Sequence, residues 1–400
     1  MRILALLAVV FCAAAARAET IRIAFIDPLS GPAAAVTQNG LNHFRFMAER
    51  LSGPARQFEV TGYDNRLSPQ ETIVQAQKAI DAGIRILAQG NGSAAAGALA
   101  DFVVKHNERN PEARVLYLNY AAIDPVLTGE RCSPWHFRFD AHADMKMLAL
   151  AKFIATRSQV RRVYLINQDY SFGQAVRAAA LAMLKRERPD IVIAGDELHP
   201  MAKITDFAPY VAKIRASGAD SVITGNWGSD LALLLKSAAE TGLQTDWYTY
   251  YASGIGSPTA VRQTGLAHRV HAVIEGHANM PMDDRLEEDY RARFGGSFNV
   301  PRIRLAMEML ADAVAKAGSS DSDAVVAAMA GAERRTMYGA MAIMPAHDHQ
   351  VLQDLYVASF GPLEGAMRHD EEKTGWGWKT AGMVKAAETA LPSECRMAKR

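Results

Sequence analysis

Two runs of short apolar strands, each strand followed by a helical segment, constrain the fold of this 400-residue chain most strongly. In the first run we expect strands at residues 21–26, 57–62, 84–89 and 114–119, and helices at 38–51, 69–82 and 95–110. In the second run we expect strands at 162–167, 191–195, 221–225 and 247–251, and helices near 174–187, 206–217 and 229–241. Apolar strands that alternate with crossover helices form parallel sheets covered on both faces. The pattern therefore predicts an α/β protein with two doubly wound parallel-sheet lobes.

The segments outside these two runs are less regular. Residues 132–140 lie between the runs, and we interpret them as a crossover in which Asp140 caps a helix that begins near Ala141. After residue 260 we expect a strand at 270–275 and helices at 283–294, 300–317 and 322–330. The mixed-charge residues 364–375 are interpreted as a solvated loop.

The beginning of the chain has the pattern of an export signal. Arg2 supplies positive charge, residues 3–16 are apolar, and Ala16-Arg17-Ala18 is a small-residue cleavage motif. The apolar run is shorter than the roughly 20 residues that span a bilayer, which argues against a membrane anchor. Large residues before Cys12 argue against lipid attachment there. We expect cleavage after Ala18 and export of the mature chain.

The composition is that of an ordinary globular protein, with 49% hydrophobic and 22% charged residues. The formal net charge of +1 becomes −1 when Arg2 and Arg17 leave with the signal. A nearly neutral chain has no electrostatic reason to bind nucleic acid. A small molecule or a protein is therefore the expected partner.

Cys132 and Cys395 are the two cysteines that remain after cleavage. An even number of cysteines in an oxidising compartment predicts one disulfide between them. Two buried free thiols are the alternative.

Several motifs at strand ends and helix starts match one known family. They are Asp27–Pro32 (DPLSGP), Tyr63-Asp64-Asn65, Pro69-Gln70 and Asn167–Gly173 (NQDYSFG), and they extend over nearly the whole mature chain. Their order and spacing resemble the periplasmic solute-binding proteins of ABC transporters, of the leucine/isoleucine/valine-binding type. The resemblance implies three crossings between the lobes, and secretion through the inner membrane into the periplasm. The expected lobes are residues 19–138 with 273–345, and residues 139–272 with 346–400.

The turns that follow the strands of the first lobe are candidate ligand contacts, because ligands of open parallel sheets bind beyond the carboxyl ends of the strands. Asn91 and Ser93 lie in such a turn before a helix, where backbone N–H groups favour a carboxylate. A tight turn that needs its glycines only for backbone freedom is the alternative. Ala121, Ala122 and Ile123 follow the next strand, where the resemblance implies Ala-Ala-Thr in amino-acid-binding relatives. The Ile123 side chain weakens the case for an α-amino acid.

Aromatic residues follow the strands of the second lobe. We expect Tyr170, Phe172, Trp227, Tyr250 and Tyr251 to supply ligand contacts, although at most some of the tyrosines can face the cleft. A Ser171 helix cap with Phe172 in the core is the alternative for that turn.

The charged residues of the expected cleft bear on the ligand. The resemblance implies a Glu near Tyr251 to pair with a ligand ammonium, but no acid occurs between Trp247 and Arg262. Arg302 and Arg304 open a helix near the expected cleft and could bind a carboxylate bidentately. Their alternative is a solvent-facing position on that helix. We therefore expect a pocket with aromatic surface and no ammonium partner.

No catalytic or metal-binding pattern is evident in the sequence. His136, Asp140 and His142 have metal-ligand spacing, as do residues 347–349, but we interpret both sets as surface turns. We find no H-E-x-x-H, G-x-S-x-G or P-loop motif, and we expect neither an enzyme nor a cofactor.

The expected function follows from the resemblance. It implies a monomeric receptor that captures a small hydrophobic or aromatic carboxylate or an amino acid by cleft closure. The receptor would then deliver its ligand to ABC permease subunits in the inner membrane. A sensory protein that docks on a membrane receptor is the alternative.

Overall fold

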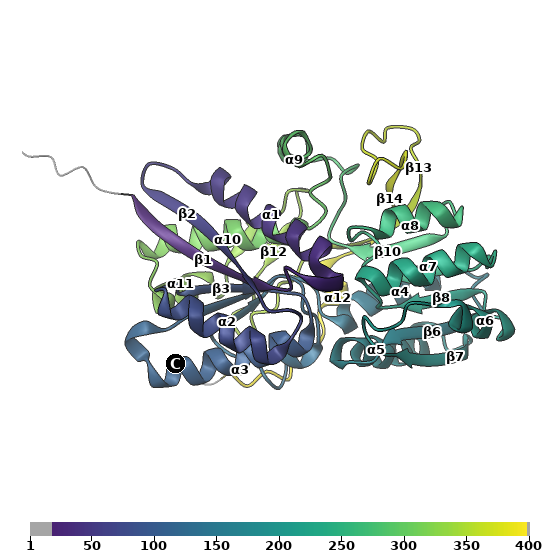
Figure 1. Ribbon diagram of the computed structural model, residues 1–400, viewed down its shortest axis with the longest axis horizontal. Coiled ribbons are helices and arrows are strands. Elements are labelled where there is room, and N and C mark those ends of the chain that lie inside the picture. The colour runs from purple at the N-terminus through teal and green to yellow at the C-terminus, as the bar shows by residue number, and fades with distance from the viewer. Residues whose placement is uncertain (1–17, 398–400) are drawn as a thin grey trace, which may run out of the picture.

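The computed structural model describes residues 18–397, which form two α/β lobes side by side (Figure 1). The predicted signal segment lies almost entirely outside the described residues, so cleavage after Ala18 stays a prediction. Within residues 18–397, none of the helices combines the length and the apolar character needed to cross a membrane.

The first lobe is built on a five-stranded parallel sheet with strand order β2-β1-β3-β4-β5. Its strands are β1 (Glu19–Asp27), β2 (Arg56–Asp64), β3 (Ile86–Gln89), β4 (Leu116–Asn119) and β5 (His136–Arg138). Its helices are α1 (Ala34–Leu51), α2 (Pro69–Asp81), α3 (Ser93–Arg109), α10 (Pro301–Ala317) and α11 (Ser322–Met329). Every residue of β3 and β4 is buried, because α2 packs with α3, and α1 packs with α10, around the sheet.

The second lobe contains a seven-stranded sheet with strand order β14-β13-β10-β9-β8-β6-β7. Its parallel strands are β6 (Arg162–Gln168), β7 (Val192–His199), β8 (Ser221–Thr224), β9 (Asp246–Thr249) and β10 (Val270–Ile274). Its helices are α4 (Ala143–Ala155), α5 (Ser171–Glu187), α6 (Ala208–Ala216), α7 (Gly228–Glu240) and α8 (Ser257–Thr264). The sequence did not predict the antiparallel edge formed by β13 (Leu355–Pro362) and β14 (Trp376–Val384).

The remaining elements connect or cover these sheets. They are α9 (Leu286–Phe294), α12 (Ala386–Thr389) and the small hairpin of β11 (Glu333–Arg335) and β12 (Met341–Ile343). The chain passes between the two sheets after β5, after β10 and between β12 and β13. This is the predicted two-lobe fold with three crossings. The exact lobe boundaries stay a prediction, and β10 keeps residues 273 and 274 paired within the second sheet.

Two helix starts test the local predictions. Pro69 begins α2, and the Ser68 side chain caps it by accepting a hydrogen bond from the Glu71 N–H, as favourable capping chemistry requires. The predicted cap of α4 is wrong, because His142 occupies that position. Asp140 instead lies fully buried in the first crossing, where it pairs with cations.

The surface-turn interpretation of the two histidine sets holds only at His347, whose side chain is 66% exposed. His136 and His349 are 1% exposed, and the His349 ring stacks on Phe137 with ring centroids 3.9 Å apart. The surface interpretation is therefore wrong for these residues, which are part of the first lobe's packing.

The predicted disulfide between Cys132 and Cys395 is confirmed, with Cα atoms 5.6 Å apart and a sequence separation of 263. Cys132 lies in the first-lobe loop that leads to β5, whereas Cys395 follows α12, which packs on α4 of the second lobe. The disulfide thus adds a covalent link between the lobes.

Candidate ligand-binding site

A cavity lies between the carboxyl ends of the two sheets, and its empty space, counted together with the mouth that is open to solvent, is about 670 Å³. Turns that follow β3 and β4 border it from the first lobe, and turns that follow β6, β8 and β9 border it from the second. The predicted residues at its wall are Asn91, Ser93, Ala121, Ala122, Ile123, Tyr170, Phe172, Trp227, Tyr251 and Arg302. Tyr250 and Arg304 are not among the described residues that border it.

A buried carboxylate fixes the turn after β3. Asp27 Oδ1 accepts a hydrogen bond from the Asn91 N–H at 2.9 Å, and Oδ2 accepts one from the Tyr120 hydroxyl at 2.6 Å. Burial raises the pKa of Asp27 to about 7, although these hydrogen bonds oppose the shift. A Cβ atom on Gly90 would lie 2.8 Å from the Ala121 nitrogen, so the two turns approach too closely for a side chain there. The turn after β3, and with it the start of α3 at Ser93, is therefore held in a fixed position at the cavity.

The turn after β4 is held by its own asparagine. The N–H groups of Ala121 and Ala122 both donate to Asn119 Oδ1, at 3.2 and 2.8 Å. These two N–H groups are therefore already engaged within the turn. The Ile123 side chain is 1% exposed and belongs to the apolar core of the second lobe. Ile123 therefore borders the cavity, and its side chain also makes an apolar contact from the first lobe to the second.

The aromatic wall comes from the second lobe. The Trp227 Nε1–H donates to the Tyr170 hydroxyl at 2.8 Å, which fixes both rings. Phe172 lies 5.8 Å from Tyr170 between ring centroids and is 3% exposed, so it both packs in the core and borders the cavity. The Ser171 cap is wrong, because the N-cap position of α5 is Tyr170, whose side chain makes no capping bond.

Adjacent tyrosines have different environments. The Tyr251 hydroxyl lies 3.1 Å from both the Ala121 carbonyl oxygen and Asp140 Oδ2, and its ring borders the cavity. The Tyr250 hydroxyl donates to the Ala143 carbonyl at 3.0 Å, and its ring is fully buried in the second lobe. The prediction for Tyr250 is therefore corrected, because this side chain points into the core.

The two arginines of α10 also separate. Arg302 borders the cavity, and its Nη1 lies 3.0 Å from Glu275 Oε2 while its Nε donates to the Tyr120 carbonyl at 2.7 Å. Arg304 pairs with Asp284 at 3.0 Å and Glu308 at 2.8 Å. Residues two apart on a helix point about 200° apart, so both could not face one cavity. The prediction for Arg304 is corrected, and the solvent-facing alternative fails for Arg302, whose side chain is 11% exposed.

The sequence did not identify the residues that close the cavity mouth. The Asn39 side chain donates to Asn299 Oδ1 at 2.8 Å, and Asn299 Nδ2 donates to the Ser253 carbonyl of the second lobe at 2.9 Å. Asn39 carries no signal, since it lies within α1 and not after a strand. Asn299 could have been found from its place just before Arg302.

The acids near the cavity were also missed. None of the described residues that border it is Asp or Glu. Asp140 and Glu275 nevertheless lie directly behind Tyr251 and Arg302, at the first and second crossings. Both acids lie outside residues 247–262, the stretch around Tyr251 where the resemblance implied an acid.

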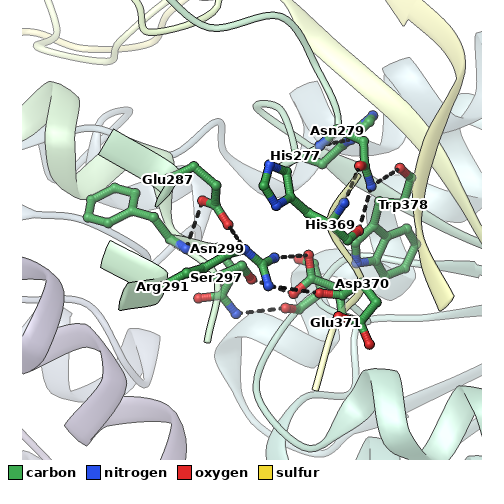
Figure 2. Close-up of polar contacts among 12 residues, drawn as sticks. His277, Asn279, Glu287, Arg291, Ser297, Asn299, His369, Asp370, Glu371 and Trp378 are labelled. Atoms are coloured by element: carbon green, nitrogen blue, oxygen red, sulfur yellow. Dashed lines mark hydrogen bonds and ion pairs between the residues drawn. The ribbon is translucent and has the colours of Figure 1, made fainter. Parts of the chain in front are cut away.

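A second set of contacts joins the lobes beside the mouth (Figure 2). The Ser297 hydroxyl donates to Glu371, and Arg291 Nη1 donates to the Asp370 carbonyl at 3.0 Å. The Asn279 side chain holds the same loop by accepting from the His369 N–H at 2.9 Å. Burial raises the pKa of Glu371 to about 8. The solvated-loop interpretation of residues 364–375 is therefore wrong at Glu371, which is 6% exposed.

Known proteins resemble this chain in sequence and in fold. The Leu/Ile/Val-binding protein homolog 4 of Brucella melitensis biotype 1 is 32% identical over 352 residues, 84% of this chain and 83% of the relative. The closed conformation of a leucine-, isoleucine-, valine-, threonine- and alanine-binding protein from Brucella ovis superposes with a TM-score of 0.82 at 28% identity, over 96% of this chain and all of that one.

A further solved structure with the same fold holds an aromatic acid. It is a solute-binding protein of an ABC transporter from Rhodopseudomonas palustris BisB5 in complex with 3,4-dihydroxy benzoic acid, with a TM-score of 0.75 at 19% identity. It covers 92% of this chain and 98% of its own. The model of the periplasmic binding protein family matches residues 20–362. The chain therefore belongs to the periplasmic binding protein family.

Proposed function

We propose that this protein is the extracytoplasmic substrate-binding component of an ABC transporter of the branched-chain-amino-acid type. It captures a small hydrophobic or aromatic carboxylate, or an amino acid, by closing its two lobes over the ligand. The observation that carries the proposal is one cavity bordered by strand-end turns of both lobes and closed by contacts between them. The family model and the named relatives support the same assignment.

The ligand docks first on the first lobe, where Ser93 begins α3 and the helix dipole favours a carboxylate. Closure then brings Tyr170, Trp227 and Tyr251 over its apolar part. Binding energy shifts an equilibrium between open and closed forms, and no covalent step is needed. The closed form is the one presented to permease subunits.

Two features support a ligand with a carboxylate and an apolar body. Arg302 places a cation at the wall of the cavity, and Tyr170, Phe172, Trp227 and Tyr251 supply aromatic rings from the second lobe. The named relatives include both amino-acid and aromatic-acid types. One is a Leu/Ile/Val-binding protein homolog, and another was solved in complex with 3,4-dihydroxy benzoic acid.

A thermal-shift screen of the purified protein tests the proposal, because a ligand that binds only the folded state raises the melting temperature. The panel contains leucine, isoleucine, valine, benzoate, hydroxybenzoates and short branched-chain acids. At least one member should raise the melting temperature in a dose-dependent way. A flat response to the whole panel would contradict the proposed class of ligand.

A further inference from the structure

Four charged side chains form one cluster directly behind the cavity wall, which we name the hinge charge cluster: Asp140, Lys146, Glu275 and Arg302. Lys146 Nζ lies 2.8 Å from Asp140 Oδ1 and 3.1 Å from Glu275 Oε1. Arg302 lies 3.3 Å from Asp140 Oδ2 through Nε and 3.0 Å from Glu275 Oε2 through Nη1. Each of the four carboxylate oxygens therefore contacts a cation.

The cluster is removed from water. The side chains of Asp140, Lys146 and Glu275 are at most 2% exposed, and that of Arg302 is 11% exposed. Two cations and two carboxylates give it no net charge when all four are ionised. In this buried environment an uncompensated charge interacts strongly with its neighbours, because little solvent screens it.

The cluster connects the hinge to the ligand-facing wall. Asp140 and Glu275 lie at the first two crossings, Lys146 comes from α4 and Arg302 from α10. Arg302 itself borders the cavity, and its contacts within the cluster use Nε and Nη1 but not Nη2. Lys146 Nζ lies 5.0 Å from the centroid of the Tyr251 ring, which also borders the cavity.

We propose that the hinge charge cluster determines which ligand charge the site accepts. It selects a ligand that has a carboxylate and no ammonium group. Arg302 retains a guanidinium nitrogen for a ligand carboxylate. Asp140 and Glu275 do not border the cavity, and Lys146 and Arg302 compensate their charges within the cluster, so neither acid is offered to a ligand ammonium. Asp140, Lys146 and Glu275 act through Arg302 and are positioning residues. This inference rests on the proposed function and narrows its ligand class.

A pH dependence follows from Asp140. The charged and titratable groups that surround it are Arg138, Lys146, Tyr251, Glu275 and Arg302. Burial raises the pKa of Asp140 to about 6 despite the opposing cations, whereas Lys146 and Arg302 outweigh burial at Glu275 and lower its pKa. Protonation of Asp140 leaves the cluster with a net positive charge. Affinity for an anion should therefore rise as the pH falls from 7.5 to 5.5, where a carboxylic acid of pKa about 4 stays ionised.

Three variants change the charge of the cluster in a controlled way. Asp140→Asn adds one positive charge, Lys146→Met removes one, and the double variant is neutral again and serves as the matched control. Titration calorimetry with sodium benzoate and L-leucine gives the affinities, and circular dichroism at each pH confirms folding. We expect benzoate to bind about tenfold tighter in Asp140→Asn, about tenfold weaker in Lys146→Met, and within about threefold of wild type in the double variant.

The wild-type protein tests the inference without a substitution. Its affinity for benzoate should rise severalfold between pH 7.5 and 5.5, and that rise should vanish in Asp140→Asn. Tighter binding of leucine than of every acid without an ammonium group would overturn the inference while the proposed function stood. So would benzoate affinities that do not respond to the variants or to pH. Failure of the wild type to bind any acid or amino acid of the panel would contradict the proposed function itself.

Discussion

The Tyr251 hydroxyl of the second lobe lies 3.1 Å from the Ala121 carbonyl oxygen of the first lobe. Both residues also border the cavity. The contact can form only when the lobes are close together, so it links cleft closure directly to the wall that a ligand would touch.

Replacement of Tyr251 by Phe should therefore weaken ligand binding while it leaves the fold intact. One lost hydrogen bond corresponds to about 0.5–1.5 kcal/mol, or roughly a two- to tenfold rise in Kd measured by titration calorimetry. Tyr250→Phe is the matched control, because the Tyr250 hydroxyl bonds the Ala143 carbonyl within the second lobe. The control should lower the melting temperature but keep the affinity. An effect on affinity only in the control would contradict the assignment of these neighbours.

Trp227→Ala should remove a large part of the aromatic wall. The ring is 9% exposed and is fixed by its bond to Tyr170, so its loss exposes both the ligand and the Tyr170 hydroxyl. We expect a loss of about 2 kcal/mol in binding, roughly thirtyfold in Kd. The same titration shows wild-type affinity if Trp227 does not contact the ligand.

The strand-end turns could be predicted from the sequence because they depend on local rules. An apolar strand followed by a helix start places Ser93, Tyr170 and Trp227 at the carboxyl edge of a sheet, whatever the rest of the chain does. The lobes and most helices follow from the same alternation. For Tyr250 and Tyr251 the same rule predicts that the two residues follow a strand, but it does not predict which of the two rings faces the cavity.

The hinge charge cluster could not be predicted in this way. Lys146 and Glu275 are 129 positions apart and meet only because two crossings converge. Asp140 has the sequence context of a helix cap, and tertiary pairing with Lys146 and Arg302 overrides that local preference. The β13–β14 edge was missed because its mixed-charge connecting loop, which includes Glu371, has the composition of a solvated segment.

Loss of the disulfide should destabilise the whole protein. Cys132 and Cys395 are 263 positions apart in sequence, and their disulfide joins the two lobes. Its loss raises the conformational entropy of the unfolded chain and removes the covalent link between the lobes. We expect Cys132→Ser to lower the free energy of unfolding by about 2–5 kcal/mol, as measured by denaturant titration. Cys395→Ser should give the same value, and the double variant should add nothing. Unequal single variants would show a role for one cysteine outside the disulfide.

The buried Glu371 predicts a pH-dependent stability. Its pKa in the folded protein is raised to about 8 from an ordinary value of 4.5, mainly by burial. The folded state therefore holds this proton more tightly, and the resulting stabilisation is complete below pH 4.5 and is lost as the pH rises through 8.

The Glu371→Gln variant isolates this effect, because the neutral amide can still accept the hydrogen bond from Ser297. Between pH 5 and 8 the wild-type melting temperature should fall more steeply than that of the variant. The difference in unfolding free energy should change by at most about 1.4 kcal/mol per pH unit. Parallel melting curves across this range would show that Glu371 does not titrate there.

One comparison tests most directly whether the cavity between the lobes binds a carboxylate. It measures the affinities of Arg302→Ala and Arg304→Ala for the ligand that the thermal-shift screen identifies. The two residues lie on one helix and both form ion pairs, but only Arg302 borders the cavity. We predict at least about a tenfold loss of affinity for Arg302→Ala and wild-type affinity for Arg304→Ala. Equal affinities in both variants, or a loss confined to Arg304→Ala, would contradict a ligand carboxylate at this wall.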